Sequence, residues 1–106
     1  SAKRLQWLTA DEERIAFFKK NGYEKLLPAA YRKLCDACIT FYFRCTEQVK
    51  DAEELKKELR KRLETYRANG AAWITEKNLK TRMGYELFSM SPGLYAKMLQ
   101  KMQETS

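Results

Sequence analysis

Residues 28–69 read PAAYRKLCDACITFYFRCTEQVKDAEELKKELRKRLETYRAN, with no Gly or Pro after the first residue. Apolar side chains recur in this stretch every three or four positions, which is the period of an α-helix and not of a β-strand. Pro28 suits the first turn of a helix, and Gly70 suits the left-handed residue that often follows a helix end. The apolar stripe consists of Tyr31, Leu34, Cys38, Phe41 or Tyr42, Cys45, Val49, Ala52, Leu55, Leu59, Leu63 and Tyr66. The pattern predicts an all-α fold built on a long central helical segment.

The length of this segment raises a physical problem. At about 1.5 Å per residue, a helix of about forty residues spans roughly 60 Å, whereas a compact chain of this size is roughly 35 Å across. We therefore expect a break or strong kink near residues 48–51, where Asp51 could cap a second helix with Glu53 and Glu54 in its first turn. The alternative is one continuous helix that buries its overhang against a partner, because the apolar stripe runs straight across the expected break.

The two halves of the segment differ in character. Residues 37–45 are apolar on nearly all sides, which predicts a central helix covered by other elements. A strand is the alternative there, since Ile, Thr, Phe and Tyr also favour sheets. Residues 51–69 carry a narrow stripe flanked by charged side chains, which is typical of a helix with one exposed face or of a short coiled-coil seam.

Further helices are expected before and after this segment. Thr9 and Glu12 form a capping-box pattern that predicts a helix ending at Asn21-Gly22, with residues 1–8 as a flexible arm or a short helical turn. A second pattern predicts a helix over 75–83, capped by Thr75 and stopped by Gly84, then an apolar loop over 85–90 that packs down. Ser91 and Pro92 open a last helix whose expected inward residues are Leu94, Tyr95, Met98, Leu99 and Met102. We expect one domain over 1–106, a bundle of four to five helices.

Composition limits the class of protein. A chain of 106 residues with 44% hydrophobic residues can bury a core without a metal or disulfides. No apolar run approaches the roughly 20 residues that span a bilayer, so no membrane partner is expected. The three cysteines lie on one helical stretch, which fits an intracellular, cytoplasmic and reducing compartment better than a disulfide framework.

Catalysis is not expected from this sequence. The chain has no histidine, the most frequent general base and metal ligand, and no Gly-rich phosphate loop. Cys35 and Cys38 have the spacing of a metal or redox motif, with Cys45 two turns further on, but a fourth zinc ligand is missing. We interpret the cysteines as packing residues and expect no enzyme activity, no cofactor and no small-molecule substrate.

The expected helices 75–83 and 91–103 resemble a helix-turn-helix, in which the second helix enters the major groove of DNA. The expected connection of about seven residues is longer than the three or four of that motif. The same string is similar to the last two helices of sterile-alpha-motif domains, which mostly bind proteins. A net charge of +7 is compatible with nucleic acid, although it is spread over the whole chain. The residues predicted to contact DNA or RNA are Lys80, Arg82, Lys97 and Lys101.

The helical stripes extend beyond what one small core needs, which indicates a non-catalytic binding module acting through protein–protein contact. The expected partner is another protein or a second copy of the chain, and the protein would act as a small regulator or inhibitor. Its predicted surfaces are the 51–69 helix and the Leu/Phe/Met-rich region 85–102. The predicted interaction residues are Leu55, Leu59, Leu63, Tyr66, Leu87 and Phe88. A DNA- or RNA-binding regulator is the alternative.

Overall fold

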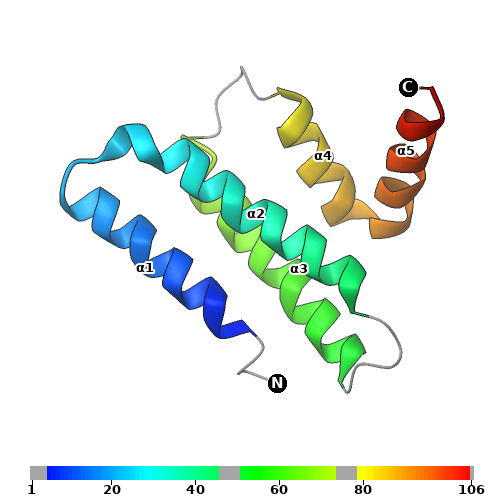
Figure 1. Ribbon diagram of the computed structural model, residues 1–106, viewed down its shortest axis with the longest axis horizontal. Coiled ribbons are helices and arrows are strands. Elements are labelled where there is room, and N and C mark those ends of the chain that lie inside the picture. The colour runs from blue at the N-terminus through cyan, green and yellow to red at the C-terminus, as the bar shows by residue number, and fades with distance from the viewer. Residues whose placement is uncertain (1–4, 46–50, 74–78, 106) are drawn as a thin grey trace.

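The structure is a computed structural model that describes residues 5–45, 51–73 and 79–105. The described residues form five α-helices and one short 3-10 helix, and they contain no strand, which confirms the predicted all-α bundle (Figure 1). The elements are α1 (Gln6–Lys20), η2 (Glu24–Leu26), α2 (Leu27–Arg44), α3 (Ala52–Asn69), α4 (Leu79–Met90) and α5 (Pro92–Thr105).

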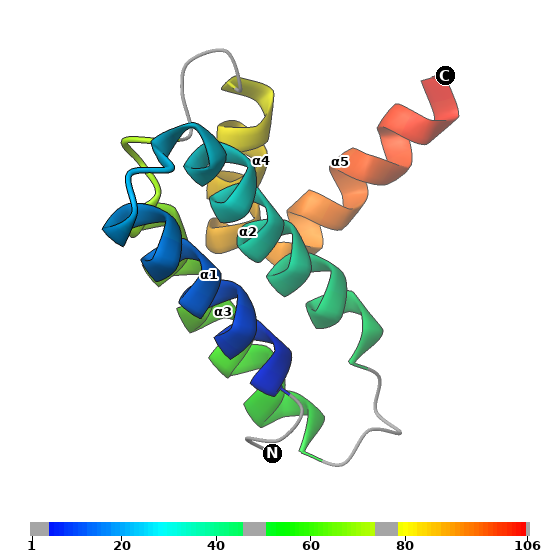
Figure 2. The same cartoon turned by 60° about the vertical axis from the view of Figure 1, so that its left-hand side comes forward.

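The long central segment is broken into two helices. α2 ends at Arg44, α3 begins at Ala52, and the two lie side by side in opposite directions (Figures 1 and 2). The predicted break is confirmed, although α2 ends earlier than expected and residues 46–50 lie outside the described chain. A continuous helix and a strand over 37–45 are both wrong. Folding back lets the two halves bury their apolar stripes against each other, so no overhang needs a partner.

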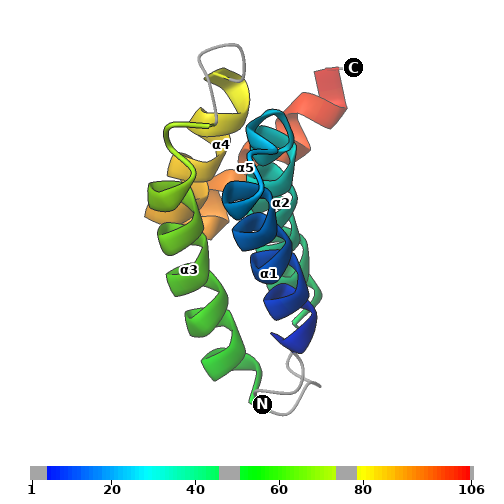
Figure 3. The same ribbon diagram turned by 90° about the vertical axis from the view of Figure 1, so that its left-hand side faces the viewer.

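α1 packs beside α2 and completes a three-helix body with α3 (Figure 3). Polar contacts tie α1 to α3: the Tyr66 hydroxyl donates a hydrogen bond to Glu12 Oε1, and Arg62 lies 3.4 Å from the same carboxylate. The core of this body consists of Leu5, Leu8, Ile15, Leu27, Tyr31, Leu34, Cys35, Cys38, Ile39, Cys45, Ala52, Leu55, Leu59, Leu63 and Tyr66. The cysteines are therefore packing residues, as predicted.

The start of α1 differs from the prediction. The helix begins at Gln6, so Thr9 lies inside it and the predicted cap is wrong. Residues 5–8 do not form an arm in this structure, because Leu5 and Leu8 are buried in the core. Burying a leucine stabilises a fold by about 1.5–3 kcal/mol, more than the typical 1 kcal/mol of a cap. The predicted end at Asn21-Gly22 is confirmed: Gly22 has a φ of 76°, and the Tyr23 amide donates to the Phe18 carbonyl at 2.8 Å.

The C-terminal helices also differ from the prediction. α4 continues through Gly84 to Met90, so the predicted stop at Gly84 and loop over 85–90 are wrong. Tyr85 and Phe88 are buried, and their burial outweighs the roughly 1 kcal/mol that a glycine costs inside a helix. The predicted cap at Thr75 lies outside the described residues. The cap of α5 is confirmed, since the Leu94 amide donates to Ser91 Oγ at 3.2 Å.

Asp51 stands directly before α3, as predicted, but it does not cap the helix with its side chain. Its backbone is left-handed, with a φ of 64°, and its carboxylate makes no capping hydrogen bond. The Asp51 carbonyl accepts the Leu55 amide at 2.9 Å, so the first turn of α3 is still closed. The acidic first turn predicted for this helix, Glu53 and Glu54, is present.

Gly70 ends α3 for a reason other than the predicted one. Its φ of −91° is not left-handed, but the residue is buried and a Cβ there would lie 2.8 Å from Cγ and Cδ1 of Tyr31. We expect Gly70→Ala to lower the free energy of unfolding by about 1–3 kcal/mol, because the buried Tyr31 ring would have to move. Urea unfolding followed by circular dichroism measures the change.

Gly84→Ala is the matched control, because the nearest atom to its added Cβ would be Tyr95 Cε2 at 3.7 Å. Inside α4 the alanine is expected to stabilise the protein by about 0.5–1 kcal/mol. Equal effects of the two substitutions, in either direction, would contradict the close approach of Gly70 to Tyr31.

Candidate functional site

α4 and α5 form a V whose apex is the single residue Ser91, and α5 extends away from the three-helix body (Figures 1 and 2). α4 is held on α3 by a hydrogen bond from Arg60 to the Ser89 carbonyl at 3.0 Å and by an ion pair between Arg67 and Glu86 at 3.7 Å. The first turn of α5 therefore starts from a fixed point on the body.

An aromatic cluster orients α5. The Tyr95 ring stacks on Phe43 of α2 with 6.1 Å between ring centroids, and it meets the edge of Phe88 of α4 at 5.7 Å. Phe88 is fully buried and also contacts Tyr42 at 5.0 Å. These rings anchor the beginning of α5, and the rest of the helix extends away from the body (Figure 2).

An apolar groove of about 670 Å³ lies between α4 and α5. We call it the methionine groove, because all four methionines of the chain line it. Its apolar lining consists of Met83, Leu87, Met90, Tyr95, Met98, Leu99 and Met102. Lys80 also lines the groove, as do the acidic residues Asp36 and Glu86.

The lining of this groove is exposed to an unusual degree for such side chains. Met90 is 78% exposed, Met83 59% and Met102 55%. Contiguous exposed apolar side chains are typical of surfaces that bind another macromolecule. Methionine suits such a surface, because its flexible and polarisable side chain adapts to partners of different shape.

A second hollow adjoins the methionine groove along α5. This depression of about 520 Å³ is lined by Leu94, Lys97 and Lys101 and shares Leu87, Met98 and Met102 with the groove. Leu94 is 52% exposed. The prediction that Leu94, Leu99 and Met102 point inward is therefore wrong, because all three are exposed and α5 touches the body mainly through α4 and through Tyr95.

The predicted interaction residues fall into two groups. Five of them, Leu55, Leu59, Leu63, Tyr66 and Phe88, are buried inside the chain and do not form an exposed surface. The α3 stripe is covered by α2, which the sequence pattern alone could not show. Only Leu87 lies in the methionine groove. Met90 falls within the predicted surface region 85–102, whereas Met83 lies outside it, although the confinement of every methionine to residues 83–102 is a visible signal.

The predicted nucleic-acid-binding residues line three different hollows. Lys80 borders the methionine groove, and Lys97 and Lys101 lie in the second depression beside α5. Arg82 lies in a third hollow, shared with Arg67 of α3. The connection between α4 and α5 is one residue, shorter than the turn of a helix-turn-helix motif. Binding of DNA or RNA stays a prediction.

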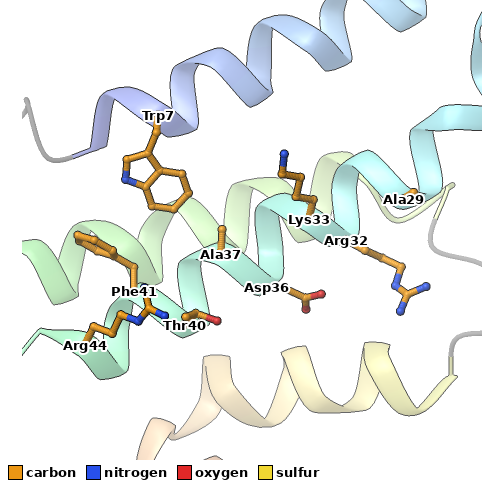
Figure 4. A pocket seen from close by; sticks show the side chains of 9 residues that line it. All are labelled: Trp7, Ala29, Arg32, Lys33, Asp36, Ala37, Thr40, Phe41 and Arg44. Carbon is orange, nitrogen blue, oxygen red and sulfur yellow. The ribbon is translucent and has the colours of Figure 1, made fainter.

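A separate hollow of about 730 Å³ lies over the exposed face of α2 (Figure 4). Trp7 points from α1 toward Phe41, with 5.7 Å between ring centroids. Two of its charged residues are engaged within the chain: Lys33 Nζ lies 3.4 Å from Asp11, and Asp36 accepts the Tyr85 hydroxyl at 2.7 Å. This hollow is more polar than the methionine groove, and we take the groove as the candidate site.

The described residues thus define a small five-helix protein with an exposed apolar groove between its last two helices. No protein-family model, curated protein or solved structure matches this chain. Within the described ranges, no helix has both the length and the apolar character needed to cross a membrane. The same ranges hold no group of three Cys, Asp or Glu side chains placed to bind a metal ion.

Proposed function

We propose that this protein is a non-catalytic binding module that acts through protein–protein contact. The methionine groove is its binding site, and the apolar face of an amphipathic helix from a partner is the ligand. The observation that carries the proposal is the exposure of Met83, Met90 and Met102 in one groove. The buried thiols suit a reducing compartment, so the protein would act in the cytoplasm.

The shape and chemistry of the groove favour a helix over an extended chain. Its walls are two helices, of which α4 has 12 residues. At about 1.5 Å per residue, that wall is roughly 18 Å long and fits a helix of three to four turns. Both walls present side chains and helical backbone, so they have no strand edge to pair with, whereas helix-in-groove binding needs only apolar pockets.

We expect a stapled helical peptide with leucine at positions i, i+3, i+4 and i+7 and uncharged polar residues elsewhere to bind the intact chain. Stapling reduces the conformational entropy that the peptide loses on binding. Met83→Ser combined with Met102→Ser is expected to weaken binding at least tenfold. Burying one methionine side chain in a complex contributes roughly 1.5–3 kcal/mol of binding free energy. Fluorescence anisotropy of the labelled peptide measures the affinity.

The matched control is Phe17→Ser combined with Leu26→Ser, which removes exposed apolar side chains far from the groove. Phe17 is 56% exposed and Leu26 49% exposed. The control should bind the peptide within about twofold of the original chain, since exposed side chains outside a contact contribute little. No binding by the original chain, or an equal loss in the control, would sink the proposal.

A further inference from the structure

We infer that the partner helix of the methionine groove is acidic: its apolar stripe is flanked by Asp or Glu residues that face lysines of α4 and α5. This inference rests on the proposed function, because it assigns the chemistry of the ligand to the same groove. It follows from which charges around the groove are already engaged within the chain.

The acidic groups near the groove are satisfied inside the molecule. Glu86 forms an ion pair with Arg67, 3.7 Å away, and Asp36 accepts the Tyr85 hydroxyl at 2.7 Å. Within the described chain, by contrast, neither Lys80 nor Lys97 forms an ion pair. Lys80 and Lys97 therefore present positive charge to a ligand that enters the groove.

The lysines stand where the flanks of a bound helix would lie. Lys80 of α4 lines the groove itself, and Lys97 and Lys101 of α5 line the depression that adjoins it. Met98 and Met102 line both hollows, so the apolar surface is continuous between these cations. A helix with a central apolar stripe and acidic residues beside it matches this order of charge and apolar surface.

A second copy of this chain fits less well. A symmetric contact through the face of α5 that carries Lys97 and Lys101 would place the lysines of both copies in one interface. α5 offers one acidic residue, Glu104, against these two cations. Like charges at an interface oppose association, which favours a partner of opposite charge. Nucleic acid would meet the lysines but would leave the methionine surface exposed to water.

The test compares three stapled peptides that share one apolar pattern and carry Glu, Gln or Lys at the flanking positions. At about 50 mM salt, where exposed charges are weakly screened, we expect the Glu peptide to bind about tenfold tighter than the Gln peptide. The Lys peptide should bind most weakly. Near 1 M salt the Debye length falls to about 3 Å and the three affinities should converge.

Lys80→Glu combined with Lys97→Glu should reverse the order of the Glu and Lys peptides. The matched control, Lys20→Glu combined with Lys25→Glu, changes the net charge equally at two exposed residues near the end of α1. It should keep the original order. Equal binding of the Glu and Gln peptides would overturn the acidic partner and leave the proposed function standing, whereas binding of none of the three would overturn both.

Sedimentation of the chain without peptide completes the experiment. A monomer is expected, since the lysines of α5 disfavour self-association. A dimer that dissociates when the Gln peptide is added would make the second copy the occupant and would overturn the inference. Displacement of the Glu peptide by a short DNA duplex at equal concentration would also overturn the inference, because it would make nucleic acid the ligand.

Discussion

Phe88→Ala is expected to lower the free energy of unfolding by about 3–5 kcal/mol, the range for removing a fully buried aromatic ring. Phe88 is 0% exposed, and its ring lies within 5.0–5.8 Å of the rings of Tyr42, Phe43 and Tyr95. Removing it leaves a cavity where α2, α4 and α5 meet. Since a domain of this size is stable by only about 5–15 kcal/mol, the loss would be a large share of the total.

Urea unfolding followed by circular dichroism gives the free energy. Phe88→Leu keeps most of the volume and should recover much of the loss, because volume-conserving apolar changes usually cost less than about 1.5 kcal/mol. Phe17→Ala, at a phenylalanine that is 56% exposed, is the control and should change stability far less. A loss below about 1 kcal/mol in Phe88→Ala would show that the aromatic cluster does not hold α4 and α5 on the body.

The protein is also expected to lose stability steeply in alkaline solution. Burial raises the pKa of the Cys38 thiol to about 12, and burial together with the charges of Cys38 and Asp36 raises the pKa of the Cys35 thiol to about 12. In the unfolded chain a thiol ionises near pH 8.5, so unfolding releases a proton above that pH. Stability is then constant below about pH 8.5 and falls as the pH rises toward 12, by about 2 kcal/mol for each thiol at about pH 10.

Two tyrosines also lower the stability of the fold as the pH rises, but at a higher pH than the thiols. Burial and the hydrogen bond to Asp36 raise the pKa of Tyr85, and burial and the hydrogen bond to Glu12 raise the pKa of Tyr66. Because both pKa values are raised, the tyrosines stabilise the fold below about pH 10, and this contribution is lost as the pH rises further.

Urea midpoints at about pH 7 and about pH 10, in the presence of a reductant, measure the alkaline effect. Cys35→Ala combined with Cys38→Ala should lose markedly less stability between these two pH values, because the groups that ionise are gone. Leu59→Ala is the control: it removes a core side chain and should lower stability at both pH values without changing the difference. If the original chain and the double cysteine variant lost stability equally, the thiols would not be the cause.

Local pattern was sufficient for the helical class but not for every boundary. The three- to four-residue period predicted the helices over 28–69, and length arithmetic predicted that they break. The predicted start of the first helix and the predicted end of the helix at Gly84 are wrong, because the local signals at Thr9 and Gly84 do not show that Leu5 and Phe88 are buried. Burial of such side chains depends on contacts with distant residues and outweighs the local signals.

The candidate site was the least predictable part of the molecule. Two sets of apolar residues look alike in sequence, since both repeat with helical spacing. They are the α3 stripe of Leu55, Leu59 and Leu63 and the methionines of α4 and α5. The stripe is buried against α2, whereas Met83 and Met90 line an open groove. The region 85–102 was predicted as a surface, but its individual exposed residues were mostly not.

By itself, the sequence determined the all-helical class, and it predicted a break near residues 48–51 and cysteines that serve in packing. These properties follow from spacing and composition within single segments. Only the tertiary structure decided which apolar faces are covered, why Gly70 must lack a side chain and how α5 projects from the body. The reason is physical: periodicity identifies a face that avoids water, but only the packing of distant segments decides whether another part of the same chain covers it.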